Sequence, residues 1–209
     1  ASLYPGAQGS SVIKVCDLTV ASTGLNEKSA REAGLAYEKI VLSPMNHAGY
    51  YPGGKMMTMK VLYEKGSLRI LGAQIVGYEG VDKRIDVLAT AMQMGGKVTD
   101  LTELDLAYAP PYSSAKDPVN MAGFMAENIE AGLVKQFHWD QVADLPREID
   151  PQKPVYVMCQ SGLRSYLACR ILAQHGYDCY NFSGGYRFYA SVMLDQLAAQ
   201  SAYPCGVER

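Results

Sequence analysis

Hydrophobic and polar residues alternate along the stretch from Lys55 to Gly77, and a period of two is typical of strands with one buried face. The polar run at residues 64–67 interrupts the alternation and supplies a turn, so the stretch predicts a β-hairpin. We expect two further extended segments, a β-branched run from Ser11 to Cys16 and the run 37–42. The apolar positions of the hairpin are Met57, Met59, Val61 and Tyr63, then Leu68, Ile70, Ala73 and Ile75.

Apolar residues at helical spacing follow the hairpin. A charged first turn and a stop at residues 95–96 predict a helix over 82–94 that packs on the sheet. Asp117 is a plausible N-cap with Pro118 at the first helical position, which predicts a second helix ending near Gly132. Shorter helices are expected between residues 26 and 36 and around 101–104. This order predicts an α+β domain with an antiparallel sheet and helices.

The pattern changes after residue 133. Residues 135–154 form a polar, proline-containing connection, and a strand (155–158), a helix (162–175), a short strand (179–181) and a final helix follow. A βαβα order favours a parallel sheet, so we expect a small α/β unit. The predicted organisation is a linker or the severed end of a longer chain at residues 1–10, one domain at 11–133, and a second at 134–209.

Composition argues against nucleic-acid binding and against a membrane segment. The 209 residues include 19 basic and 21 acidic side chains, a formal net charge of −2, and the basic residues are scattered. A duplex-binding protein would show a basic patch, so nucleic acid is not expected as a partner. No apolar run approaches the length of a membrane span, and the N-terminus has no signal-peptide pattern. We therefore expect a cytoplasmic protein without a membrane segment.

Five cysteines occur at irregular spacings, with no CxxC pair and no histidines at metal-ligand spacing. Neither a metal site nor a disulfide framework is expected, because both need regular spacing. Cys16, Cys169 and Cys179 have apolar neighbours and are predicted to be buried thiols, whereas Cys205 in the tail is predicted to be exposed. Cys159 differs, because it ends a strand where a helix begins.

The position of Cys159 suits an anionic sulfur. Unpaired N–H groups and the dipole at a helix N-terminus stabilise a thiolate or a persulfide, which lowers the pKa of the thiol. Gly162 permits a tight loop. Arg164 offers a positive charge, donors for an anionic sulfur substrate, or a salt bridge that braces the loop.

Tyrosines gather in two loops. In residues 107–112, Ala-Tyr-Ala-Pro-Pro-Tyr, the paired prolines exclude regular structure and are expected to hold Tyr108 and Tyr112 on a stiff extended segment. Tyr50 and Tyr51 lie in the loop before the hairpin. His47 lies in the same loop. It either lines a site together with these tyrosines or is an ordinary polar loop residue.

Residues 159–165, Cys-Gln-Ser-Gly-Leu-Arg-Ser, are similar to the active-site loop of the rhodanese family, and residues 181–186, Asn-Phe-Ser-Gly-Gly-Tyr, resemble its last strand and turn. In that family the cysteine accepts a sulfane sulfur as a persulfide and passes it to a thiol or cyanide. The resemblance implies that Cys159 is a sulfur carrier with Arg164 beside it. It also implies a persulfide-binding loop formed by Gln160, Ser161, Gly162 and Leu163.

The second domain also departs from the rhodanese pattern. The Asp-Val-Arg-like and Gly-His-Ile-Pro-like motifs that begin such domains are absent, and 15 residues, 140–154, separate Trp139 from the cysteine strand. The unit is shortened, and the alternative interpretation is an inert Cys159 in a degenerate rhodanese-like module. A phosphatase or arsenate reductase of the Cys-x5-Arg type would need arginine at the position of Ser165, so this third hypothesis is the least favoured.

Four segments of the first domain resemble the C-terminal dimerisation domain of pyridine nucleotide-disulfide oxidoreductases. The resembled branch contains CoA-disulfide reductases and NADH-dependent persulfide or polysulfide reductases, some fused to rhodanese. The resemblance implies a homodimer in which tyrosines of one subunit reach the partner's active site, where a phenol can donate a proton to a leaving thiolate. The matching residues are Tyr50 or Tyr51 and Tyr108 or Tyr112, and the alternative is interface aromatics that only pack. The segments are residues 17–24, 46–53, 80–88 and 105–123.

The resembled enzymes bind their cofactors in two Rossmann-type domains, but no Gly-x-Gly-x-x-Gly occurs in this chain. FAD, NAD(P)H and CoA are therefore implied for a complete enzyme and have no motif here. We predict that the chain is the C-terminal portion of an enzyme that reduces CoA-disulfide, CoA-persulfide or polysulfide. This portion is expected to form a homodimer and to associate with the FAD and NAD domains of the complete enzyme. The expected substrate is a low-molecular-weight thiol, disulfide or persulfide. The alternative is a non-catalytic assembly module with a rhodanese remnant.

Overall fold

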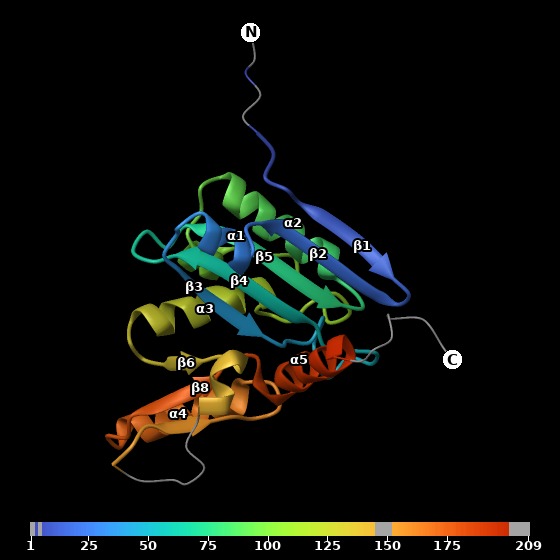
Figure 1. The fold of residues 1–209 in the computed structure, drawn as a ribbon. Helices are drawn as coiled ribbons and strands as arrows, with labels where there is room; N and C mark the ends of the chain where they lie inside the picture. The colour runs from blue at the N-terminus through green and yellow to red at the C-terminus, as the bar shows by residue number, and fades with distance from the viewer. Residues whose placement is uncertain (1–2, 4–5, 145–151, 201–209) are drawn as a thin grey trace. The chain divides into compact units, whose positions relative to one another are not determined.

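The computed structural model, which describes residue 3 and residues 6–144 and 152–200, shows an antiparallel sheet of five strands in the first part of the chain (Figure 1). Its strands are β1 (Ser11–Val15), β2 (Leu18–Gly24), β3 (Tyr37–Leu42), β4 (Thr58–Glu64) and β5 (Ile70–Gly77). Their order across the sheet is β1-β2-β5-β4-β3. The expected antiparallel sheet is confirmed, and so is the hairpin formed by β4 and β5.

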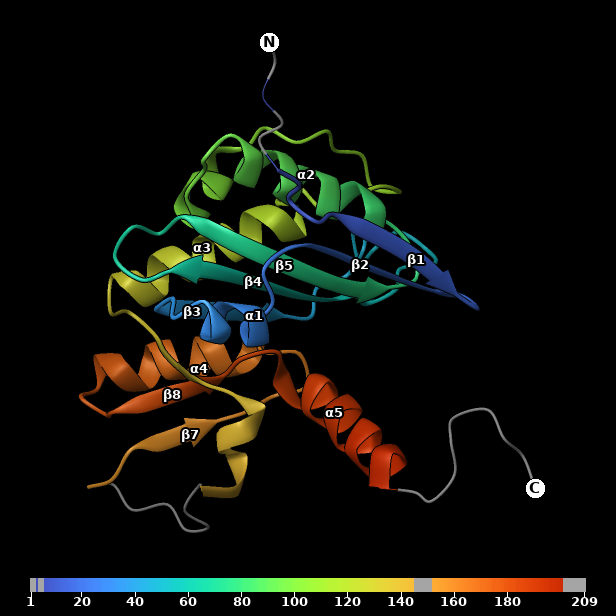
Figure 2. The same cartoon turned by 45° about the horizontal axis from the view of Figure 1, so that its top comes forward.

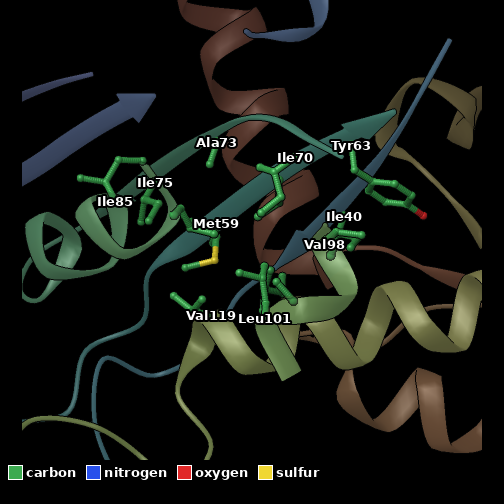
Figure 3. Packing of buried hydrophobic residues seen from close by; sticks show 14 of the residues in the cluster. Ile40, Met59, Tyr63, Ile70, Ala73, Ile75, Ile85, Val98, Leu101 and Val119 are labelled. Carbon is green, nitrogen blue, oxygen red and sulfur yellow. The ribbon is translucent and has the colours of Figure 1, made fainter. Parts of the chain in front are cut away.

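Three helical segments cover one face of this sheet. They are α2 (Val81–Gln93), the 3-10 helix η1 (Val98–Glu103) and α3 (Pro118–Glu130). Figure 3 shows their apolar side chains meeting those of the central strands. The register explains the core, since Met59 lies opposite Ile75 and Val61 opposite Ala73, so the predicted alternation turns all four side chains to one face. A short helix, α1 (Glu27–Glu32), packs Ala30 against Leu62 and Leu71 in a second cluster.

A second compact unit, Gly132–Arg209, holds a small parallel sheet. The elements are β6 (Lys135–Phe137), the 3-10 helix η2 (Trp139–Asp144), β7 (Val155–Val157), α4 (Leu163–Gln174), β8 (Cys179–Phe182) and α5 (Gly185–Gln200). Strand order is β6-β8-β7, and Figure 2 shows α4 lying along β8 and β7. The expected parallel sheet is confirmed. Each unit is a compact body of its own.

Two expectations about the chain need correction. The stretch predicted as a plain connection begins with β6, because Phe137 is buried against the rings of Phe182 and Tyr156 and draws this segment into the sheet. Cys16 is exposed, not buried, because it forms the tight turn between β1 and β2 with a φ of 53°. Cys169 and Cys179 are buried as predicted, and Cys205 lies outside the described residues.

Glu27 joins α1 to the sheet through an ionic network. Its carboxylate lies 2.9 Å from the Lys39 Nζ and 3.0 Å from the Lys60 Nζ. Partial burial by itself would raise the pKa of Glu27, but the two lysines outweigh it and lower the pKa to about 2. The network therefore stabilises the fold only while Glu27 is ionised.

We predict that replacing Glu27 by Gln removes a pH-dependent part of the stability. A carboxyl with a lowered folded pKa contributes its stabilisation above the ordinary value of 4.5 and loses it as the pH falls towards about 2. Near neutral pH the loss should be about 1–3 kcal/mol, and it should vanish near the folded-state pKa. Urea unfolding of both proteins, measured from neutral pH down to the folded-state pKa of Glu27, gives this loss of stability. Glu32→Gln, an exposed carboxylate of the same helix, should show little effect, and equal behaviour of the two variants would contradict the prediction.

Candidate functional site

The Cys159 thiol lies between the end of β7 and the start of α4 and is half-buried. The Gly162 N–H donates a hydrogen bond to the Cys159 Sγ at 3.2 Å. The Ser165 hydroxyl lies 3.5 Å from the same sulfur and 3.0 Å from the Gly162 carbonyl oxygen. The thiol thus occupies the place of a capping group for α4, whose first N–H groups have no partner within the helix.

The first turn of α5 binds the backbone of this loop. The N–H groups of Tyr186 and Arg187 donate to the carbonyl oxygens of Cys159 and Gln160, at 2.7 and 3.1 Å. This close approach requires glycine, because Gly185 has a φ of 68° and a Cβ there would lie 2.6 Å from the Gly162 nitrogen. With its carbonyls bonded to α5, the loop is held in the shape that presents the Gly162 N–H to the sulfur.

The Cys159 thiol ionises near neutral pH. Partial burial by itself would raise its pKa, but hydrogen bonds from the Ser165 hydroxyl and from the N–H groups of Ser165, Ser161 and Gly162 lower it from 9.0 to about 7. A substantial fraction of the thiol is therefore the nucleophilic thiolate at pH 7. The arrangement can hold an anionic sulfur and can attack an electrophilic one.

The predicted loop residues divide into two groups. Ser161 and Gly162 supply N–H groups to the sulfur, and Gln160 uses its carbonyl oxygen to bind α5. Leu163 and Arg164 are exposed in the first turn of α4. Within the described part of the chain no hydrogen bond or ion pair joins Arg164 to the thiol. Arg164 is also not among the groups that shift the pKa of Cys159, so its three predicted uses stay predictions.

Sequence reasoning missed Ser165 and Gly185 as parts of this site. Both residues lie in segments that resemble the rhodanese family, but the sequence assigned neither of them a role at the sulfur. A hydroxyl in the first turn of the helix can reach back to a capping group, and this was the available signal for Ser165. The contact between Gly185 and the cysteine loop joins segments that are distant in sequence.

The tyrosines of the first unit meet across two loops. The hydroxyl groups of Tyr50 and Tyr108 share a hydrogen bond of 2.7 Å, although 76% and 46% of these residues' surfaces are exposed. This bond raises the pKa of Tyr108 above its ordinary value, and partial burial acts in the same direction. Of the two alternatives in each loop, the structure therefore pairs Tyr50 with Tyr108.

The other two predicted tyrosines lie apart from this bond. Tyr51 is exposed and meets the buried His47 edge to face, with ring centroids 5.6 Å apart. Tyr112 is exposed after a turn in which its N–H donates to the Ala109 carbonyl oxygen. The segment is thus not extended throughout, because Pro110 occupies the turn position that its fixed φ favours.

The described residues are 3, 6–144 and 152–200, and they were searched for metal-binding clusters and for membrane-spanning helices. No group of three or more His, Cys, Asp or Glu in these ranges could hold a metal ion. Within the same ranges, no helix combines the length and apolar character needed to cross a membrane.

Two family models match the chain one after the other. The dimerisation domain of the pyridine nucleotide-disulphide oxidoreductases matches residues 10–119, and the rhodanese-like domain matches residues 125–191. The first match contains the paired Tyr50 and Tyr108, and the second contains the Cys159 loop.

Curated relatives resemble more than half of the chain. The chain is 40% identical over 124 residues to the coenzyme A disulfide reductase of Staphylococcus epidermidis, which covers 59% of this chain and 28% of that protein. The corresponding protein of Staphylococcus haemolyticus is 39% identical over 127 residues, covering 61% and 28%. The chain therefore spans 28% of the length of these relatives.

Solved structures extend the likeness to most of the chain. The reduced CoADR-RHD of Bacillus anthracis is 40% identical with a TM-score of 0.87, covering 93% of this chain and 41% of that one. A NAD-dependent persulfide reductase from A. fulgidus is 36% identical with a TM-score of 0.82, covering 90% and 40%.

We predict that Ser165→Ala raises the pH at which Cys159 becomes reactive. Loss of one hydrogen bond to a thiolate should move the midpoint of alkylation up by about one pH unit from its value near 7. Iodoacetamide labelling across the pH range, read by mass spectrometry of the Cys159 peptide, measures the midpoint. Ser191→Ala, which removes an exposed hydroxyl from α5, is the matched control. An unchanged midpoint in Ser165→Ala would show that the hydroxyl does not stabilise the thiolate.

Proposed function

The chain belongs to the pyridine nucleotide-disulphide oxidoreductase family through its dimerisation domain, and from this premise we propose that it is the sulfur-handling and dimer-forming part of a CoA-disulfide, persulfide or polysulfide reductase. The rhodanese-like unit would load sulfur on Cys159. The observation that carries the proposal is a thiol with a pKa of about 7, held among N–H donors at a helix N-terminus.

The proposed chemistry at Cys159 is sulfane transfer. The thiolate attacks the outer sulfur of a donor such as thiosulfate, a new S–S bond forms on Cys159, and sulfite leaves with the electron pair of the broken bond. The same N–H groups that stabilise the thiolate would stabilise the terminal persulfide anion. Attack by an acceptor thiolate on the terminal sulfur then releases a new persulfide and restores the Cys159 thiolate.

The proposed role of the tyrosine pair is proton donation. A phenol that shares a hydrogen bond with a second phenol, as Tyr50 and Tyr108 do, can donate a proton to a thiolate that leaves from a disulfide. In the proposed homodimer the pair of one subunit would serve the active site of its partner. Because both residues are exposed, they are accessible to such a partner.

The cofactors of the proposed reductase have no binding motif in this chain. No Gly-x-Gly-x-x-Gly segment occurs in the sequence, so neither FAD nor NAD(P)H has a dinucleotide-binding loop here. Electron transfer from nicotinamide through flavin would be supplied by other domains of a longer protein. This chain contributes the dimer interface, the phenols and the sulfur carrier.

We predict that thiosulfate adds one sulfur atom to Cys159. Intact-mass spectrometry after brief incubation should show this gain, and Cys159→Ser should abolish it. Cys16→Ser, which removes an exposed thiol from the other unit, should leave it unchanged. If no sulfur is gained, the rhodanese-like unit is not a carrier, and assembly of the dimer remains as the function.

We also predict that Tyr50→Phe and Tyr108→Phe slow the reduction of CoA disulfide by the complete reductase. A general acid typically contributes at least about 100-fold to the rate, so kcat should fall by about that factor in each variant. Tyr78→Phe, which alters an exposed tyrosine near Lys55, is the control and should retain activity. Stopped-flow kinetics with CoA disulfide and NAD(P)H measure the effect. Wild-type kcat in both variants would mean that the tyrosines only pack.

A further inference from the structure

A buried ion pair lies beneath the tyrosine loops. The Arg84 side chain in α2 is 0% exposed and that of Asp117, the N-cap of α3, is 1% exposed. Arg84 binds Asp117 with two parallel bonds, from Nε to Oδ1 at 3.1 Å and from Nη2 to Oδ2 at 2.9 Å. Bidentate pairs of this kind fix geometry as well as charge.

The remaining donors of Arg84 reach two other segments. Its Nη1 donates to the Gly80 carbonyl oxygen at 2.9 Å, and its Nη2 donates to the Asn46 carbonyl oxygen at 2.7 Å. Asn46 opens the loop that carries Tyr50. One guanidinium therefore ties the first tyrosine loop to the starts of α2 and α3.

Ser113 makes the corresponding link for the second tyrosine loop. Its side chain is buried, with 1% of the residue exposed, and its hydroxyl donates to the Asp117 Oδ2 at 2.6 Å. Its carbonyl oxygen accepts the Ala48 N–H at 2.9 Å, two residues before Tyr50. Ser113 thus connects the ion pair to both loops at once, through its side chain to Asp117 and through its backbone to Ala48.

We propose that Ser113 is a positioning residue for the Tyr50–Tyr108 pair, through which the buried Arg84–Asp117 ion pair sets the distance between the two phenols. The inference rests on the proposed function of the pair. Exposed side chains gain little from packing, so the 2.7 Å contact between the hydroxyls depends on where their loops are held. Three residues hold the loops. Asn46 binds Arg84 directly, and Ala48 is connected to Asp117 through Ser113.

Ser113→Ala tests this directly in the 209-residue chain. The change removes one donor but leaves both Arg84–Asp117 bonds and the Val119 cap of α3 in place. We expect the Ala48 amide to exchange with deuterium about tenfold faster, since one hydrogen bond to a charged group is lost from the anchor. The Tyr108 phenol should titrate at lower pH, and Tyr50→Phe, which removes the pair, should shift it in the same direction. NMR of tyrosine-labelled protein, assigned with Tyr108→Phe, measures this titration.

Two comparisons separate positioning from general destabilisation. Ser114→Ala removes the neighbouring hydroxyl and should change neither readout, and Ser113→Thr, which keeps the hydroxyl, should restore both. Amides in β4 should exchange at the wild-type rate in all variants. Unchanged exchange and titration in Ser113→Ala would overturn the inference, and so would an equal acceleration in β4.

The activity of the complete reductase tests the premise separately. If Ser113→Ala shifts the titration of Tyr108 and lowers kcat as Tyr50→Phe does, both the inference and the proposed function stand. If the titration shifts while Tyr50→Phe retains full kcat, the positioning role stands and the proposed function of the pair fails.

Discussion

The N–H groups that open a helix have no partner inside it, and both candidate sites are built on this constraint. In the first unit, the Asp117 carboxylate accepts the Val119 N–H and so caps α3. In the second, the Cys159 sulfur accepts the Gly162 N–H at the start of α4, and the first N–H groups of α5 bind the backbone of the same loop. In each case the group that satisfies the helix is also the group on which the site is built.

The two capping groups differ in how they respond to protons. Burial by itself would raise the pKa of Asp117, but Ser113, the Val119 N–H and Arg84 lower it below its ordinary value. The carboxylate is therefore charged throughout the neutral range and can serve as a permanent anchor. The Cys159 thiol, with a pKa of about 7, changes its charge within that range, which suits the proposed role of binding sulfur and releasing it.

Local patterns in the sequence were sufficient for most elements. The apolar spacing over 82–94 and the Asp117-Pro118 cap correctly predicted α2 and α3, and the strand-to-helix position of Cys159 predicted its lowered pKa. Long-range contacts were not predictable in this way. Arg84 fell within the charged first turn of the helix predicted over 82–94, and its burial depends on contacts with Asp117, 33 residues later, and with Asn46, 38 residues earlier.

The same distinction explains why the choice among the tyrosines needed the structure. Each loop offered two candidates, and sequence alone could not show which two hydroxyl groups are hydrogen-bonded, because this depends on how two residues 58 positions apart meet. The Ala48 N–H is bound to Ser113 and Ser113 to Asp117, so both loops are connected to one ion pair. In the proposed arrangement, two exposed phenols are held at hydrogen-bond distance without being buried themselves. The free energy that holds their loops in place comes from the buried groups beneath them.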